Sequence, residues 1–205
     1  MLRRAAILTI LLLFAAHARA LDVRVTDVRA ASAIVQASIE LRDLIPDRFR
    51  QVIDDGGVLH VRLQTELWES RPVWDRLVYP AMIRMFRLVR AATGRDVTLV
   101  DADGVSVPVP GRAGADIPVV VDIGDRARVT ADSRYYVHVI ATVGTLAERE
   151  VDEAGDAVFG RATEANGLGS LGRLVFRTAL QVSGYLQSIS AETKSRRILG
   201  RDIIH

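Results

Sequence analysis

Alternation of apolar and polar residues is the clearest pattern along this chain. In residues 59–68, every second side chain from Leu59 to Leu67 is apolar or threonine, and the side chains between them are polar or, at Trp68, aromatic. Successive side chains of an extended chain point to opposite faces, so this segment predicts a β-strand with one buried side. Residues 135–143 show the same alternation. Strands of this kind cannot bury an apolar face alone, and we therefore expect a layered β fold.

Further short runs predict the remaining strands of this fold. Residues 21–30 and 35–41 continue the period of two, and residues 117–123 are rich in β-branched side chains. Residues 97–100 and 105–109 flank an Asp-Gly turn and predict a hairpin. Several short strands separated by turn signals favour a mainly β domain over residues 21–151, an antiparallel β-sandwich that is immunoglobulin-like or similar.

Helical spacing appears in two places. Residues 43–55 predict one short internal helix, with Pro46 suited to its first turn and Gly56 to a left-handed cap. Residues 171–198 predict a long C-terminal amphipathic helix, which would pack on the sandwich, on a partner or on a membrane surface. The acidic and glycine-rich residues 152–170 before it predict a linker or long loop. Residues 74–92 fit either a helix or an extended run.

The first twenty residues predict export. Arg3 and Arg4 precede an apolar run, and Ala18-Arg19-Ala20 has the small-x-small pattern that signal peptidase cleaves. We expect a cleavable signal peptide over residues 1–20, cleavage after Ala20, and a periplasmic or secreted protein; an uncleaved anchor is the alternative. No later segment is apolar for long enough to cross a bilayer. Membrane contact is therefore expected only through residues 1–20 or the C-terminal helix.

Charge and cysteine content narrow the class of partner. Without the three arginines of the signal peptide, 24 basic residues remain from the 27, against 25 acidic ones. This balance, without a clustered basic patch, argues against nucleic acid as a partner. The chain contains no cysteine, so its core must hold the fold without disulfides.

Several short motifs are shared with one family. The residues that carry the resemblance are Asp55-Gly56-Gly57-Val58, Glu66-Leu67-Trp68-Glu69-Ser70-Arg71, Trp74-Asp75-Arg76, Ala92-Thr93-Gly94-Arg95, Asp103-Gly104 and Arg134-Tyr135-Tyr136-Val137. The first five of these motifs make the segment over residues 37–104 resemble domain-of-unknown-function family 4390, a family of uncharacterised exported bacterial proteins, and residues 134–137 are similar to it too. The chain departs from the family pattern around Ala91 and from Gly144 onward. The resemblance implies a secreted, mostly β protein with no established activity or cofactor, and it favours extended structure in residues 74–92.

No pattern of residues predicts a catalytic, metal or cofactor site. Residues 167–172 match the G-x-G-x-x-G fingerprint, but a good strand does not precede them, and we expect a helix lead-in instead of a dinucleotide site. The acidic turns near Asp103 and Asp156 lack the ligand series of a calcium loop. His60 and His138 lie mid-strand and would approach each other if their strands pair, but a third metal ligand is missing. We therefore expect no metal and no cofactor.

Tryptophan and arginine gather at the end of the strand over residues 59–68. These residue types dominate the energetics of protein interfaces, and Trp68, Arg71, Trp74, Asp75 and Arg76 form our candidate partner-binding site. The alternative is that the following turn or the C-terminal helix covers both tryptophans. The sequence thus predicts a non-catalytic module that binds a protein or another envelope component. An envelope hydrolase that uses His60 or His138 with a nearby carboxylate is the alternative function.

Overall fold

The residues that the structure describes form mainly antiparallel β-strands, with two small α-helices. A computed structural model describes residues 21–45, 47–91, 96–109, 115–145 and 188–205, with the side chain of Arg48 left out.

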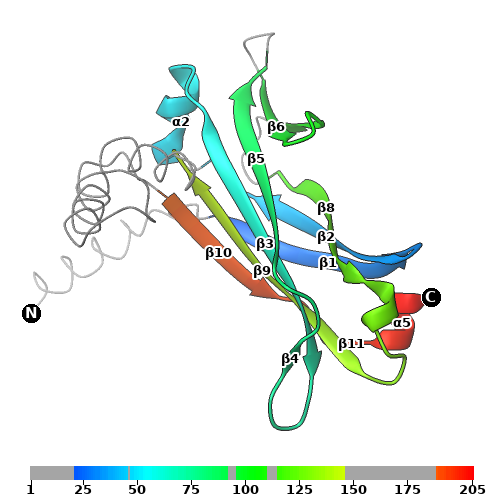
Figure 1. The fold of residues 1–205 in the computed structure, drawn as a ribbon. Helices are drawn as coiled ribbons and strands as arrows, with labels where there is room; N and C mark the ends of the chain where they lie inside the picture. The colour runs from blue at the N-terminus through cyan, green and yellow to red at the C-terminus, as the bar shows by residue number, and fades with distance from the viewer. Residues whose placement is uncertain (1–20, 46, 92–95, 110–114, 146–187) are drawn as a thin grey trace, which may run out of the picture.

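Three strands form the first sheet, in the order β1 (Asp22–Ala31), β2 (Ile34–Arg42) and β8 (Ile117–Asp125). The second sheet has eight strands, and its main path connects six of them (Figure 1). In spatial order these are β10 (Ser188–Lys194), β9 (Arg134–Gly144), β3 (Leu59–Ser70), β5 (Met82–Arg90), β6 (Val97–Asp101) and β7 (Ser106–Val109), while β4 (Arg76–Leu77) pairs with β3 and β11 (Ile198–Leu199) pairs with β9.

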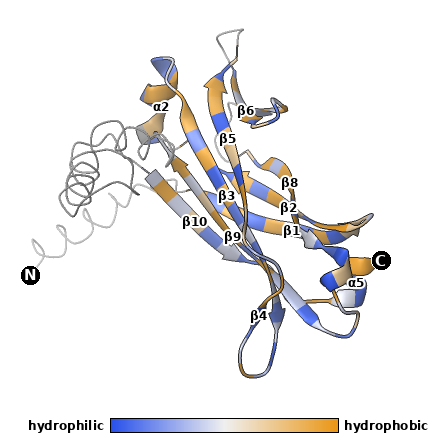
Figure 2. Ribbon diagram, viewed as in Figure 1, coloured by the Kyte–Doolittle hydropathy of each residue, from blue (hydrophilic) through white to orange (hydrophobic). Residues whose placement is uncertain are grey.

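Both sheets contribute to one hydrophobic core. Along β3, each residue on the parity of Leu63 is buried and each residue between is partly exposed. Val139 on β9, Ile39 on β2 and Val121 on β8 belong to the same buried cluster, and hydropathy alternates along the strands in Figure 2. Full burial of one aliphatic side chain contributes roughly 1.5–3 kcal/mol. The predicted period of two is therefore confirmed as the basis of the core.

The register between β3 and β9 decides which side chains meet on the outer face of the second sheet. These strands pair antiparallel from His60 opposite Gly144 to Ser70 opposite Arg134. Trp68 consequently lies opposite Tyr136, and Glu66 lies opposite His138. The hairpin predicted over residues 97–109 is formed by β6 and β7, which pair from Val97 opposite Val109.

The internal helix is shorter than the sequence predicts. Helix α2 spans Asp47–Asp54, and its Phe49 and Ile53 are buried in the core. Residues 43–45 are not helical because Asp43, with φ of 51°, turns the chain out of β2. Gly56 does adopt the left-handed conformation predicted for the cap, with φ of 82°. Pro46 lies outside the described residues.

Residues 76–77 and 82–90 are strands, so the extended reading of this region is confirmed over those residues. The C-terminal prediction is wrong over residues 188–198, because Ser188–Lys194 is strand β10 and Ile198 belongs to β11. The physical reason is that Ile189, Ala191 and Thr193 also alternate with exposed residues, and the ladder of β9 satisfies their backbone. Residues 171–187 of that predicted helix lie outside the described residues, as do the signal peptide, the predicted linker over residues 152–170 and the glycine motif.

An extra residue separates β10 from β11. Lys194 pairs with His138 of β9, and Ile198 pairs with Tyr135. Three residues, 195–197, lie between Lys194 and Ile198, but only two lie between Tyr135 and His138 on β9. The Ser195 hydroxyl accepts a hydrogen bond of 2.9 Å from the Val137 amide, and the Ser195 amide donates to the Val137 carbonyl. This bulge leads the chain into β11 and the last helix, α5 (Gly200–Ile204), whose Ile203 is buried.

Candidate functional site

The hairpin between β3 and β4 carries all five residues of the predicted binding site. Trp68 lies opposite Leu77, and Glu69 lies opposite Arg76, so residues 71–75 form the tip. The tip of the hairpin lies at the bottom of Figure 1, beyond the paired ends of β3 and β4. At its tip, Trp74 is 82% exposed and Val73 is 78% exposed. The alternative that the following turn covers Trp74 is therefore wrong.

Asp75 holds the hairpin tip in place through both of its carboxylate oxygens. Oδ1 accepts a hydrogen bond of 3.1 Å from the Arg71 amide, which closes the tip, and Oδ2 accepts one of 2.9 Å from the Tyr136 hydroxyl on β9. The Arg71 amide, followed by the Tyr136 hydroxyl, lowers the pKa of Asp75. Burial raises the pKa of Tyr136, and the bond to Asp75 raises it further. The tip is thus anchored to the neighbouring strand.

Glu69 gathers both arginines of the predicted site at the base of the hairpin. Its Oε2 accepts hydrogen bonds from Arg71 Nε at 2.9 Å and from Arg76 Nε at 2.8 Å, and its Oε1 accepts one of 2.8 Å from the Ser133 hydroxyl. Glu69 is only 8% exposed. Burial by itself raises the pKa of Glu69, but the bonds from Ser133 and the arginines outweigh it, and the pKa is lowered. The carboxylate is therefore fully engaged within the protein.

Trp68 packs against β9 rather than standing free. Its ring lies parallel to that of Tyr136 with centroids 6.4 Å apart, and the Lys194 ammonium lies 5.8 Å from the centre of the Tyr136 ring. The indole Nε1 donates a hydrogen bond of 2.9 Å to Glu66 Oε2. Trp68 thus supports the hairpin, while Trp74 faces solvent.

His138 lies between two carboxylates on neighbouring strands. Its Nδ1 is 3.0 Å from Glu66 Oε2 on β3, and its Nε2 is 2.8 Å from Glu192 Oε1 on β10. Burial raises the pKa of Glu66, but hydrogen bonds from His138, Trp68 and Gln64 outweigh that effect and lower it. Both ring nitrogens of His138 are therefore engaged by carboxylates of neighbouring strands. This row of side chains ties three strands together.

His60 and His138 do not approach each other, although their strands pair as that expectation required. His138 lies opposite Glu66, which is six positions from His60 along β3. At about 3.4 Å per residue this separates the two histidines by about 20 Å. Within the described residues, no cluster of histidine, aspartate and glutamate could hold a metal ion.

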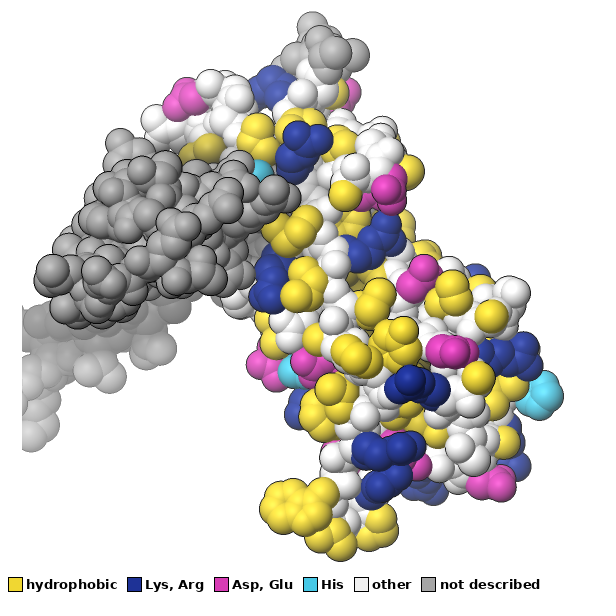
Figure 3. Space-filling model, in the orientation of Figure 1, with side chains coloured by type: hydrophobic (Ala, Val, Ile, Leu, Met, Phe, Trp, Pro, Cys, Tyr) yellow, Lys and Arg dark blue, Asp and Glu magenta, His cyan; other side chains and the backbone are white. Residues whose placement is uncertain are grey.

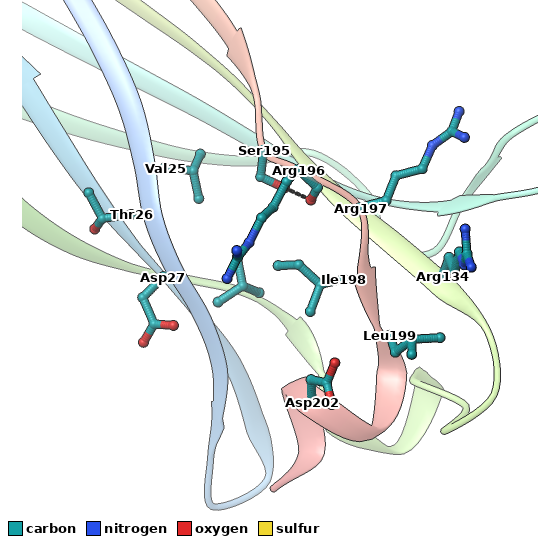
Figure 4. Close-up of a pocket in the computed structure, with 11 residues that line it drawn as sticks. Val25, Thr26, Asp27, Arg134, Ser195, Arg196, Arg197, Ile198, Leu199 and Asp202 are labelled. Atoms are coloured by element: carbon teal, nitrogen blue, oxygen red, sulfur yellow. Dashed lines mark hydrogen bonds between the residues drawn. The ribbon is translucent and has the colours of Figure 1, made fainter.

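A cavity of about 610 Å3 opens between β1 and the segment that joins β10 to β11. Val25 and Val28 of β1 and Ile198 and Leu199 of β11 contribute to its lining, and Figure 4 shows Arg196 extending towards β1. Its charged lining residues are Asp27, Arg134, Arg196, Arg197 and Asp202. The size suits a small ligand, but the mixture of both charges does not select one chemical class.

Apolar side chains continue from the hairpin along the outer face of the second sheet. Leu77, Ile83 and Met85 are exposed there, and the register places them beside Trp68, Gln64 and Arg62 of β3. Figure 3 shows hydrophobic side chains gathered on this face and at the end of the hairpin. The exposed apolar surface therefore extends beyond the five residues of the predicted binding site.

Sequence reasoning grouped the five residues of the site but predicted neither the β3–β4 hairpin nor the residues that support it. Glu69, Ser133 and Tyr136 are central to its geometry, and Lys194 and Arg197 lie beside it. Only Tyr136 had a local signal, in the motif Arg134-Tyr135-Tyr136-Val137. The contacts of the others depend on strand register, which a single sequence does not give.

Comparisons with known proteins found no matching family model, no similar curated protein and no similar solved structure. None of the helices in the described residues is long and apolar enough to span a membrane.

Proposed function

We propose that this chain is an exported cell-envelope protein whose β3–β4 hairpin binds a protein or another envelope component without catalysing a reaction. The observation that carries the proposal is the exposed Trp74 at the end of a hairpin that Asp75 and Glu69 hold in one conformation. Exposure of a large aromatic to water is unfavourable, and fixing the loop beforehand reduces the entropy lost on binding. Both features are typical of a binding surface.

We also propose a specific fold class and a family for this chain. The two sheets would form an immunoglobulin-like or similar β-sandwich, since the inward side chains of both belong to one core. We propose in addition that the chain belongs to family 4390. In its support, the motif residues Trp68, Glu69, Arg71, Trp74, Asp75 and Arg76 come together in one hairpin and share its hydrogen bonds.

The envelope hydrolase stays the second candidate function. The approach of Glu66 and Glu192 to His138 favours it, because a histidine with carboxylates can act in acid–base catalysis. Against it, these three side chains hydrogen-bond to one another and do not line the cavity described above. A His138→Gln variant that keeps the full hydrolytic activity of the wild type would assign these three side chains to structure.

A photoreactive amino acid at position 74 tests the binding function in the intact cell envelope. We expect it to form one specific crosslinked product, which an Asp75→Ala substitution weakens by loosening the hairpin tip. Position 105, an exposed valine in the turn between β6 and β7, is the matched control and should give no such product. Equal crosslinking from both positions, or none from position 74, would refute the proposed function.

A further inference from the structure

The hairpin tip presents apolar groups at its apex and positive charge around its base. Val73 and Trp74 are the most exposed of the large hydrophobic side chains in the part of the chain that the structure describes. Arg71 and Arg76 flank them in sequence, and Arg134 lies opposite Ser70 at the end of β3. Lys194 lies over the Tyr136 ring, and Arg197 is near enough to Asp75 to help lower its pKa. We name these five basic residues the cationic collar.

The five basic residues of the collar outnumber the two carboxylates at the tip and base of the hairpin, Glu69 and Asp75. Both oxygens of Glu69 and both oxygens of Asp75 accept hydrogen bonds from within the protein. Glu66 and Glu192, farther along the sheet, are directed at His138. Arg134, Lys194 and Arg197 form no ion pair with the described carboxylates at 4 Å or less. Positive charge is therefore left available to an external anion.

The shape of the tip favours a fluid partner over a folded protein. It is a protruding hairpin end (Figure 1), and a protein would have to provide a matching pocket for it. A lipid interface forms around an inserted side chain without a preformed pocket. Tryptophan is enriched at bilayer interfaces, where its ring lies in the apolar region and its N–H stays near water. Basic residues beside an inserted group add attraction to anionic headgroups.

We propose that the tip of the β3–β4 hairpin binds an anionic lipid bilayer surface, with Val73 and Trp74 inserted at the interface and the cationic collar facing the lipid phosphates. This inference rests on the proposed function and names the lipid surface as the envelope component. One short insertion gives weak, reversible binding, so attachment depends on the apolar tip and the charge together.

Tryptophan fluorescence tests the inference directly, because Trp68 and Trp74 are the only tryptophans of the chain. A Trp68→Phe variant, isolated in the form found in the envelope, reports on Trp74 alone. We expect its emission to shift to shorter wavelength with vesicles of phosphatidylglycerol and phosphatidylethanolamine, and lipids with brominated acyl chains should quench it. Vesicles of phosphatidylcholine should give a much smaller effect.

Charge variants test the role of the collar with a matched control. Arg197→Gln should weaken binding to the anionic vesicles by about fivefold, the effect of one basic residue near an anionic surface. Arg87→Gln removes an exposed charge at the other end of the sheet, opposite His60, and should leave binding unchanged. Equal effects of the two variants would contradict the inference.

Two results together separate this inference from the proposed function. Trp74 emission that anionic vesicles neither shift nor quench overturns the lipid inference. If position 74 then still crosslinks specifically to a protein in the envelope, the binding function stands and the partner is that protein. Failure of both experiments refutes both proposals.

Discussion

The Tyr136 hydroxyl donates a 2.9 Å hydrogen bond to Asp75 and thereby fastens the tip of one hairpin to the neighbouring strand β9. The ring of the same tyrosine stacks on Trp68. One side chain of β9 therefore fixes the base of the hairpin through its ring and the tip through its hydroxyl. Removal of the hydroxyl separates these two roles.

Tyr136→Phe should loosen the tip without unfolding the protein. The stack on Trp68 is kept, but Asp75 loses the hydrogen bond from the Tyr136 hydroxyl, which helps to lower its pKa. We expect the pKa of Asp75 to rise and the Arg71 amide to exchange its hydrogen faster, both measurable by NMR. An unchanged Arg71 exchange rate would show that the Arg71–Asp75 bond alone fixes the tip.

The two tryptophans should differ sharply in their contribution to stability. Trp68→Ala removes the stack on Tyr136 and a hydrogen bond to Glu66, and should lower the free energy of unfolding by about 1–2 kcal/mol. Trp74→Ala should change it by less than about 0.5 kcal/mol, because the side chain lies in solvent. Urea denaturation of both variants measures the difference, and similar values would contradict the assigned roles.

Glu69→Gln should destabilise the base of the hairpin. The substitution keeps the size of the side chain but removes the charge that Arg71 and Arg76 share. We expect a loss of about 1 kcal/mol in the free energy of unfolding, since both arginines are half exposed and screened by solvent. Glu40→Gln on β2, in the other sheet, is a control expected to have little effect.

Stability should fall in acid because of Glu66 and Glu69. Their pKa values in the folded protein are lowered, so the unfolded chain binds protons more readily. The stabilisation is fully present above the ordinary glutamate pKa of about 4.3 and disappears as pH falls through the lower folded values. The double variant Glu66→Gln and Glu69→Gln should show a shallower loss of urea stability below that pH. A slope equal to that of the wild type would refute this assignment.

Local pattern was sufficient to predict most of the strands that form the core, but not β5, whose residues fitted a helix or an extended run. Residues on the parity of Leu63 and Val139 are buried because a pleated strand separates its two faces every second residue. The same rule failed for β10, where Ile189 fits a helical period and an alternating period equally well. Pairing with β9 decided between the two periods, and such tertiary contacts are not visible in local sequence.

The sequence named the residues of the candidate site but did not predict how they are arranged. Trp68, Arg71, Trp74, Asp75 and Arg76 are close in sequence, so one turn brings them together. Which tryptophan is exposed depends on Tyr136, which is sixty-eight positions from Trp68 in the chain. The two histidines show the same limit, because their strands do pair but in a register that keeps them apart.

The edge strand β10 comes from the C-terminal end of the chain, and this has a consequence for how the molecule matures. Until residues 188–194 have been synthesised, β9 lacks its partner on that side. An open strand edge invites pairing with another chain. We therefore expect the last step of folding to close this edge, and incomplete chains to be those most in need of a chaperone.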